Sequence, residues 1–197
     1  MGQIKVTKCE IEGLYVIEPT VIGDNRGSFT EVYNQKDLKE HGIDAVFVQE
    51  NQSMSIKGVL RGLHFQKEYP QAKLARVLSG RVFDVAVDLR KNSKTYGKWF
   101  GVELSEENKK QFFVPEGFAH GLLVLSDTAV FCYKCTDFYH PGDEGGISWN
   151  DETVGIEWPN VVKTVDKVSG ELKYCLEDGT EILLSEKDKK WKEFKEI

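Results

Sequence analysis

Short runs in which apolar and polar residues alternate recur along the chain, separated by turn residues. Alternation with a period of two is typical of strands that bury one face, and clusters of Gly, Pro, Asn and Asp mark turns. The runs cover residues 13–21, 28–33, 45–53, 56–65, 74–78, 81–89, 98–104, 111–114, 121–125 and 129–136. Many short strands with little helix predict an all-β fold, an antiparallel double sheet or jelly roll.

Two segments have a helical character, residues 35–41 and the last dozen residues. Before the second of these, residues 172–176 and 180–184 flank Glu177-Asp178-Gly179, and this pattern predicts a β-hairpin. Ser185 is followed three positions later by Asp188, an arrangement typical of a helix N-terminus.

The C-terminal helix that Ser185 would cap places Trp191 and Phe194 on its packing face. The chain shows no internal repeat and no linker between domains. We therefore expect a single domain over residues 1–197, in which the hairpin and helix of residues 163–197 pack on the barrel.

Length and charge restrict the possible functions. A chain of 197 residues can bury roughly 70% of its unfolded surface without disulfides or metals. The net charge of −6 argues against a general nucleic-acid binder, because a phosphate backbone needs a basic face. No apolar run is long enough to span a membrane, and the N-terminus lacks the apolar core of a signal peptide. A cytoplasmic protein is the expectation.

The chain has four cysteines, too few for a disulfide scaffold at this length. Cys132 and Cys135 have a C-x-x-C spacing, but the residues around them indicate a strand. Side chains three apart on a strand point to opposite faces, so these thiols should share neither a metal nor a disulfide. We expect Cys9, Cys132, Cys135 and Cys175 to be reduced and structural.

The stretch Gly58–Gln66 is predicted to be a strand that carries Arg61 and His64 in apolar surroundings. A lone histidine in such a strand is more often a hydrogen-bonded core residue than a catalyst. A second stretch, Phe113–Gly121, resembles the second cupin motif, in which a Pro-x-Gly turn presents a histidine, here His120, into a β-barrel.

A cupin metal site also needs a His-x-His motif followed by a glutamate, and this chain has His64-Phe65-Gln66 followed by Lys73 and Arg76. Two histidines beside cations make a poor site for a divalent metal, so we expect none. What remains is an acid–base and anion-binding set: Arg61, His64, Lys73, Asp84, His120 and Tyr133. This set suits proton abstraction beside a carbonyl, whereas acyl transfer would need an activated Ser or Cys.

Several motifs resemble the dTDP-4-dehydrorhamnose 3,5-epimerase family. They are Arg61–Gln66, Phe83–Asp88, Pro115–Gly121, Tyr133-Lys134, Trp149–Asp151 and Gly155–Pro159. The resemblance runs from Pro19 to Pro159 and resumes at residues 184–188. It implies a cupin-like, double-stranded β-helix homodimer that needs no cofactor and inverts C3 and C5 of a dTDP-4-keto-6-deoxyhexose.

The resemblance also assigns catalytic roles. His64 would be the base that removes both protons, and Tyr133 would be the acid that reprotonates from the opposite face. Lys73 would stabilise the enolate oxygen at C4. Asp188 would pair with His64, with Asp166 as a competing partner because the segment before residue 184 is longer than in many members.

Further positions match the family's ligand contacts. Arginine and lysine would neutralise the diphosphate, and Tyr139 would stack on thymine. The substrate-binding set implied by the resemblance is Arg26, Glu31, Gln49, Asn51, Arg61, Lys73, His120, Tyr139, Glu144 and Lys187. Whether Arg26 serves its own site or the site of a second copy stays open.

Three other functions remain open from the sequence. A monofunctional C3 or C5 epimerase would share His64, Asp188 and Tyr133. A metal-dependent cupin oxygenase would bind a metal ion, and a nucleotide-sugar binding module would tolerate loss of His64.

Overall fold

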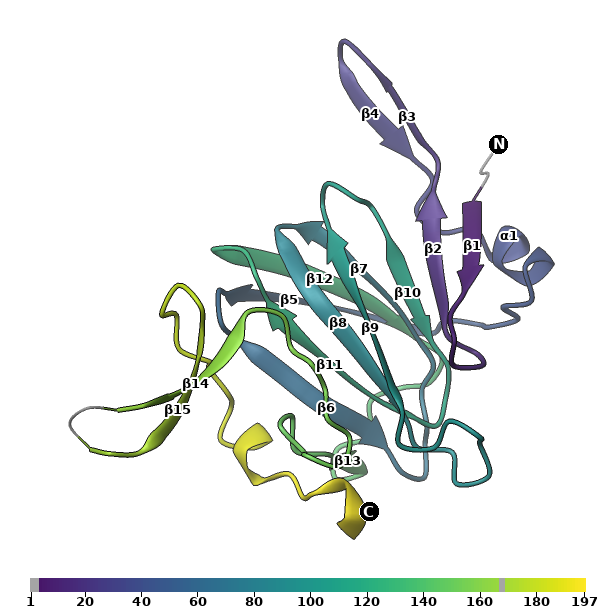
Figure 1. The fold of residues 1–197 in the computed structure, drawn as a ribbon. Coiled ribbons are helices and arrows are strands. Elements are labelled where there is room, and N and C mark those ends of the chain that lie inside the picture. Colours follow the sequence, from purple (N-terminus) through teal and green to yellow (C-terminus); the bar gives the residue numbers. More distant parts are fainter. Residues whose placement is uncertain (1–3, 167–168) are drawn as a thin grey trace.

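Two antiparallel sheets packed face to face form the body of the molecule in a computed structural model that describes residues 4–166 and 169–197 (Figure 1). The six-stranded sheet has the order β1 (Ile4–Lys8), β2 (Tyr15–Pro19), β10 (Gln111–Val114), β7 (Lys73–Ser79), β12 (Thr128–Cys135) and β5 (Gln49–Ile56). The five-stranded sheet has the order β13 (Glu144–Gly146), β6 (Leu60–Gln66), β11 (Phe118–Val124), β8 (Arg81–Asp88) and β9 (Trp99–Ser105). The predicted jelly roll is confirmed.

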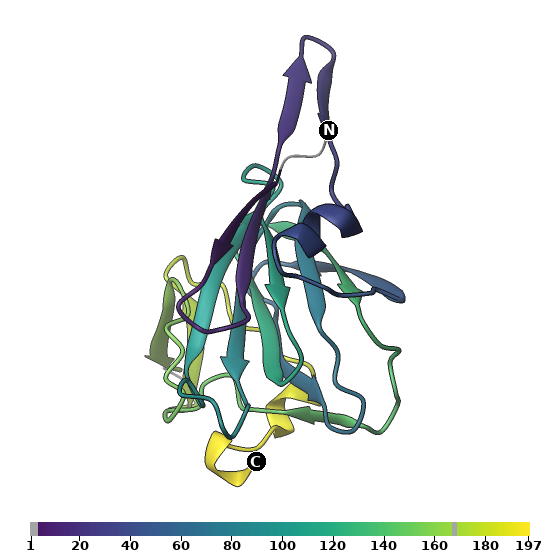
Figure 2. The ribbon, with the colours of Figure 1, turned by 90° about the vertical axis from the view of Figure 1, so that its right-hand side faces the viewer.

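Smaller elements lie around this body. They are the hairpin β3 (Val21–Asp24) and β4 (Gly27–Thr30), helix α1 (Gln35–Glu40), the hairpin β14 (Val161–Val165) and β15 (Leu172–Leu176), and the 3₁₀ turns η1 (Asp188–Lys190) and η2 (Phe194–Glu196). The β3–β4 hairpin projects away from both sheets (Figures 1 and 2). The described residues contain no helix with the length and apolar character needed to cross a bilayer.

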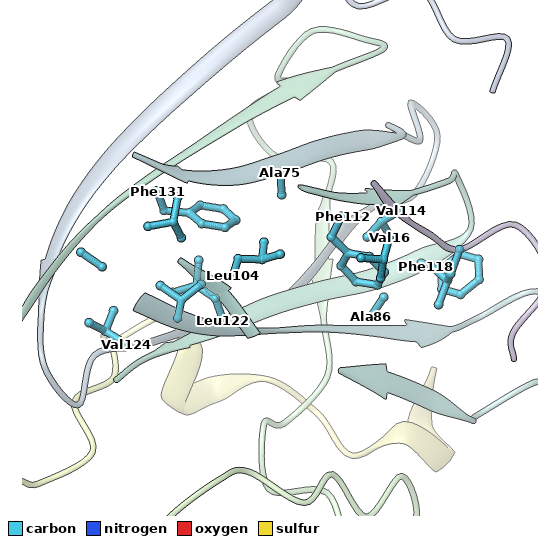
Figure 3. Packing of buried hydrophobic residues seen from close by; sticks show 14 of the residues in the cluster. Val16, Ala75, Ala86, Leu104, Phe112, Val114, Phe118, Leu122, Val124 and Phe131 are labelled. Atoms are coloured by element: carbon cyan, nitrogen blue, oxygen red, sulfur yellow. The ribbon is translucent and has the colours of Figure 1, made fainter. Parts of the chain in front are cut away.

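The main core fills the space between the two sheets (Figure 3). Phe112 and Phe131 come from the six-stranded sheet, and Leu104, Phe118 and Leu122 come from the five-stranded one. Each such buried side chain contributes about 1.5–3 kcal/mol relative to an exposed one. The alternation in the sequence predicted these strands because one face of each is buried here.

A second core covers the outer face of the five-stranded sheet. Leu60, Leu63 and Leu123 point to this side and meet Trp149 and Trp158 from the chain after β13. Leu176 and Ile182 of the C-terminal part join the same cluster. The C-terminal segment therefore packs on the strand that carries His64.

Helix α1 forms where the sequence predicts it. The Asn34 side chain caps it by accepting from the backbone N–H groups of Lys36 and Asp37. Leu38, on its buried face, packs with Ile43 and Phe113 against the six-stranded sheet.

The strand predictions are confirmed for every run between residues 13 and 136, with shifted ends for all but β10. Four strands were missed. β1 alternates but has only five residues at a sheet edge, and β3 is exposed along its whole length. β13 has only three residues, of which two are glycine, and β14 is mostly exposed.

Of the two predictions for the C-terminal part, the hairpin is confirmed in part and the helix is wrong. Residues 180–182 turn back along β15: Leu176 donates to the Thr180 carbonyl at 2.7 Å, Ile182 donates to the Tyr174 carbonyl at 3.0 Å, and Cys175 bridges Glu181. They form no strand of their own, however, and the full partner of β15 is β14. Leu183 instead bridges Val59 in parallel, at the start of the β6 region. The predicted C-terminal helix is two 3₁₀ turns.

Tertiary contacts explain why that helix stops after one turn. The Ser185 hydroxyl does accept the Asp188 N–H at 3.1 Å, as a cap would. Trp191 then leaves the helical conformation with φ −65° and ψ 144°. Lys192 pairs with Ile147 as an isolated parallel bridge, and this contact replaces helical hydrogen bonds.

The four cysteines are free, as predicted. Cys132 donates to Glu50 Oε1 at 3.2 Å, whereas the Cys135 sulfur faces the Asn51 side chain at 3.8 Å. The two thiols therefore lie on opposite faces of β12.

Gly62 on β6 and Gly121 on β11 let these two strands approach closely beside His64 and His120. A Cβ on Gly121 would lie 2.6 Å from the Arg61 carbonyl oxygen and 2.9 Å from Leu63 Cδ2. The pairing of the strands shifts register between His120 and Leu122, a bulge of the kind that redirects side chains. His64 and His120 are register partners across this junction.

We predict that Gly121→Ala lowers the free energy of unfolding by about 2 kcal/mol, because overpacking against backbone forces the strands apart. Urea unfolding measures the loss. Gly23→Ala is the matched control, since the nearest atom to its Cβ is the Gly27 oxygen at 3.5 Å. Equal unfolding midpoints for Gly121→Ala and the wild type would contradict this account of the junction.

Candidate active site

A cavity of about 540 Å³ opens between the two sheets. Its walls come from β5, β6, β7, β11 and β12, and residues 183–188 close one side. A neighbouring hollow of about 240 Å³ shares Asn51, His64, Lys73 and Tyr133 with it. The two spaces form one site, with its deep end at the histidines and its mouth at Tyr139 and Glu144.

His64 and Asp188 form a close pair in this cavity. His64 Nε2 lies 2.5 Å from Asp188 Oδ1, and the Asp188 side chain is only 4% exposed. Burial works to raise the pKa of Asp188, but the His64 contact and the N–H donor of Trp191 outweigh it and hold that pKa below its ordinary value. Asp188 is therefore ionised at neutral pH.

Two backbone connections bring Asp188 to His64 from more than a hundred positions along the chain. Leu60 donates its N–H to the Leu183 carbonyl at 2.9 Å, and Leu183 donates to the Gly58 carbonyl at 2.9 Å. The chain then passes Ser185 and turns inward at Asp188. The competing candidate, Asp166, lies at the β14–β15 turn and pairs with Lys173 at 2.9 Å.

Tyr133 and Lys73 line the same cavity from the six-stranded sheet, whereas His64 comes from the five-stranded sheet. They lie on the adjacent strands β12 and β7, with Lys73 Nζ 6.0 Å from the centre of the Tyr133 ring. Burial raises the pKa of the Tyr133 phenol and lowers the pKa of the Lys73 ammonium, because removal from water disfavours both charged forms. The phenol is thus held protonated.

Two further ionisable side chains, His120 and Arg61, line the deep end. His120 Nε2 and Asp84 Oδ1 are 2.8 Å apart and both side chains are buried, although their relative orientation does not give a hydrogen bond. Arg61 is held by Ser55, whose hydroxyl accepts from Nε and Nη2 at 3.0 Å.

The mouth contains the predicted ligand contacts Gln49, Tyr139, Glu144 and Lys187. The Tyr139 hydroxyl donates to Glu144 Oε2 at 3.1 Å, and Lys187 donates to the same oxygen. Burial opposes the ionised form of Glu144, yet these donors hold its pKa below the ordinary value. Gln49 accepts the Tyr139 N–H at 3.0 Å and so links the loop that carries Tyr139 to β5.

Two predicted binding residues do not reach the cavity of their own chain. The Arg26 side chain is 85% exposed at the turn of the β3–β4 hairpin, where it pairs with Asp24 at 2.6 Å. Glu31 follows the same hairpin and accepts from Asn34 at 3.2 Å. Neither lines the site.

Ser55, Gln66 and Trp191 shape the site but were not predicted as site residues from the sequence. Ser55 fixes Arg61, and Gln66 ties the mouth loops together through Tyr69, Phe138 and His140. Trp191 was interpreted as a packing residue, but its indole N–H points at Asp188. Its spacing of three from Asp188 within one turn is the signal that could have found it.

The arrangement fits proton transfer better than metal binding. Within residues 4–166 and 169–197, no group of three or more His, Cys, Asp and Glu could hold a metal ion. The two histidines each face their own carboxylate, and Arg61 and Lys73 add positive charge. A base on one wall and a protonated phenol on the other can remove and return protons on different faces of a bound molecule.

Comparisons with known proteins agree on one family. The family model described as dTDP-4-dehydrorhamnose 3,5-epimerase matches residues 8–196. A protein of that name from Methanothermobacter thermautotrophicus is 50% identical over 196 residues, which is 100% of this chain and 97% of the relative. Another of that name from Salmonella typhimurium is 56% identical over 156 residues, 78% of this chain and 85% of the relative.

A solved structure is also similar along nearly the whole chain. It is a dTDP-6-deoxy-D-glucose-3,5-epimerase from Legionella pneumophila in complex with dTDP-4-keto-L-rhamnose. The identity is 46% and the TM-score 0.87, covering 99% of this chain and 95% of that one.

We predict that Lys73 loses its proton at a lower pH than the surface lysines, because the cavity removes its ammonium from water. Carbon NMR of protein labelled at the lysine Cε gives the titration, and the resonance missing in Lys73→Arg identifies the residue. A Lys73 signal that titrates together with the surface lysines would show that the cavity does not desolvate it.

Proposed function

This chain belongs to the dTDP-4-dehydrorhamnose 3,5-epimerase family, and on that premise we propose how its cavity inverts C3 and C5 of dTDP-4-dehydro-6-deoxy-D-glucose to give dTDP-4-dehydro-L-rhamnose. The observation that carries the proposal is the placing of the His64–Asp188 pair and Tyr133 on different walls of one cavity. The Legionella relative was solved with the corresponding 4-keto sugar nucleotide.

His64 is the base in this mechanism. C3 and C5 both lie beside the C4 ketone, so each of their protons is acidified by the carbonyl. With Nε2–H donated to Asp188, the lone pair on Nδ1 is free to accept a proton from the sugar. The Asp188 carboxylate then stabilises the imidazolium that forms.

Lys73 stabilises the enolate. Proton removal at either carbon places negative charge on the C4 oxygen, and an ammonium nearby offsets it. Loss of one such contact costs typically about 3–4 kcal/mol of barrier. No cofactor enters this scheme, because the ketone itself acidifies both carbons.

Tyr133 returns the proton. Inversion requires the new C–H bond to form on the face opposite to the base, since a base that returned its own proton would restore the original centre. Burial favours the neutral phenol, so Tyr133 is a protonated donor at neutral pH.

The remaining residues bind the nucleotide. Arg61 and Lys187 offer charge to the diphosphate, whose burial without partners would be costly. Tyr139, half exposed at the mouth, offers its ring to thymine. Gln49, Asn51, His120 and Glu144 line the path between these two ends.

The working unit is a homodimer. The β3–β4 hairpin carries exposed apolar side chains, with Phe29 68% and Ile22 59% exposed. Such a projecting apolar hairpin is typical of an element that packs on a partner. A second copy would cover it and would receive Arg26 and Glu31, which do not reach the cavity of their own chain.

We predict that wild-type protein incubated with dTDP-4-keto-6-deoxyglucose in deuterium oxide incorporates deuterium at both C3 and C5. Proton NMR follows each position separately. His64→Asn should lose exchange at both carbons, because one base serves both. Label at one carbon only would indicate a monofunctional epimerase, and full exchange in His64→Asn would contradict the role of the base.

We predict that Tyr133→Phe retains solvent exchange but loses inversion, because the base can still remove and return a proton on its own face. The ratio of exchanged substrate to inverted product, read from the same spectra, measures this. Equal loss of exchange and inversion would contradict the donor role.

We predict that mixing two inactive variants, Arg26→Ala and His64→Ala, restores activity after subunit exchange. If Arg26 acts on the partner's site, the mixed dimer has one site with both residues intact. If Arg26 acts within its own chain, each site lacks one residue and the mixture stays inactive. Sedimentation of each variant confirms that it is dimeric.

A further inference from the structure

The oxygen of Asp188 that contacts His64 accepts a second hydrogen bond. His64 Nε2 lies 2.5 Å from Asp188 Oδ1, and Trp191 Nε1 donates to the same oxygen at 3.0 Å. Two N–H groups from different parts of the fold therefore converge on one atom of a carboxylate that is almost completely buried.

The indole that supplies the second donor is fixed by contacts that do not involve Asp188. It lies on the backbone of β13, where a Cβ added to Gly146 would come within 2.3 Å of the ring. The next residue, Lys192, forms a bridge with Ile147 and accepts the Ser148 N–H at 2.8 Å. The ring of Trp191 thus has a position set by β13, which is also the neighbour of His64 in the sheet.

His64 and Trp191 are also in direct contact. Their ring centres are 5.8 Å apart with an interplanar angle of 67°, an edge-to-face arrangement. Gly146 is the register partner of His64. One strand pair therefore fixes the imidazole and the indole together, and the carboxylate fits between them.

We propose that Trp191 is a positioning residue for the epimerisation, whose indole N–H holds Asp188 Oδ1 at the imidazole of His64. The inference rests on the proposed role of His64 as base. A carboxylate can rotate about its Cβ–Cγ bond, and a second fixed donor on the oxygen that faces His64 restricts this rotation and keeps that oxygen at the imidazole. Charge develops on the imidazole when the proton leaves the sugar, so the transition state depends on that orientation more than substrate binding does.

The test is Trp191→Phe, which retains an aromatic ring on Gly146 and beneath Lys187, whose Nζ lies 5.6 Å from the indole centre. The expected result is a kcat lowered about tenfold, the size of effect that loss of a hydrogen bond to a charged group produces. KM should not change, and deuterium exchange at C3 and C5 should fall by the same factor. Trp99→Phe is the matched control, because it removes an indole donor to the Gly155 carbonyl outside the site.

A double-mutant cycle with Asp188→Asn separates positioning from packing. If Trp191 acts through the carboxylate, Trp191→Phe has no further effect on kcat in the Asp188→Asn background. Effects that multiply independently would overturn the inference, and so would a wild-type kcat in Trp191→Phe. Gly146→Ala provides a second variant. Its added Cβ displaces the Trp191 ring, so the indole N–H is still present but no longer placed at Asp188. It should show the same loss of kcat, and a wild-type kcat there would also overturn the inference.

The same cycle distinguishes failure of the inference from failure of the proposed function. An Asp188→Asn protein with full activity would contradict the acid–base mechanism itself. A strongly impaired Asp188→Asn beside a fully active Trp191→Phe would leave the mechanism intact and remove only the role of the indole.

Discussion

The contact between His64 and Asp188 joins strand β6 of the five-stranded sheet to a C-terminal segment that is not part of either sheet. Without the C-terminal segment, His64 on β6 would line the cavity with no carboxylate beside its imidazole. The segment that delivers the carboxylate has little regular structure and is held by the Val59–Leu183 bridge and by the packing of Leu176 and Ile182 on the outer core. The irregular C-terminal part of the chain therefore contributes to the active site, as the strands of the two sheets do.

Burial acts in opposite directions on the two groups of the facing wall. It favours the neutral form of the Tyr133 phenol and so preserves the proton that an acid must carry. It also favours neutral Lys73, although the developing enolate would need the ammonium. The nearby negative charges of Asp84 and Glu144 offset part of this cost. Burial alone therefore supports the protonated phenol, whereas the Lys73 ammonium depends on the negative charges near it.

The sequence predicted most of the sheet strands because alternation reports burial of one face, and β10 was predicted with its observed limits. Alternation could not predict β13, whose glycines pack against Phe65 and Trp191 rather than burying side chains of their own. The helix prediction failed for a related reason. Ser185 gave a correct local cap, but the Lys192–Ile147 bridge and the packing of Trp191 on Gly146 ended the turn. Local signals fail where distant contacts decide the conformation.

The motif resemblance predicted most of the polar residues that line the cavity, and it favoured Asp188 over Asp166 as the partner of His64. It could not reveal that Arg26 and Glu31 lie away from the cavity of their own chain, because a motif carries no information about which copy contributes a residue. Ser55 and Trp191 act through the side chains of Arg61 and Asp188 and lie in no motif. Gln66 ends the Arg61–Gln66 motif but acts through backbone groups at the mouth. The single-domain organisation and the cytoplasmic location stay predictions.

The most direct test of the central claim is a crystal structure of the protein with a non-reacting dTDP-6-deoxyhexose in the cavity. The account predicts that the His64 imidazole and the Tyr133 hydroxyl lie on opposite faces of the pyranose, each within reach of the carbons beside C4. Both groups on the same face, or a pyranose bound away from His64, would contradict it.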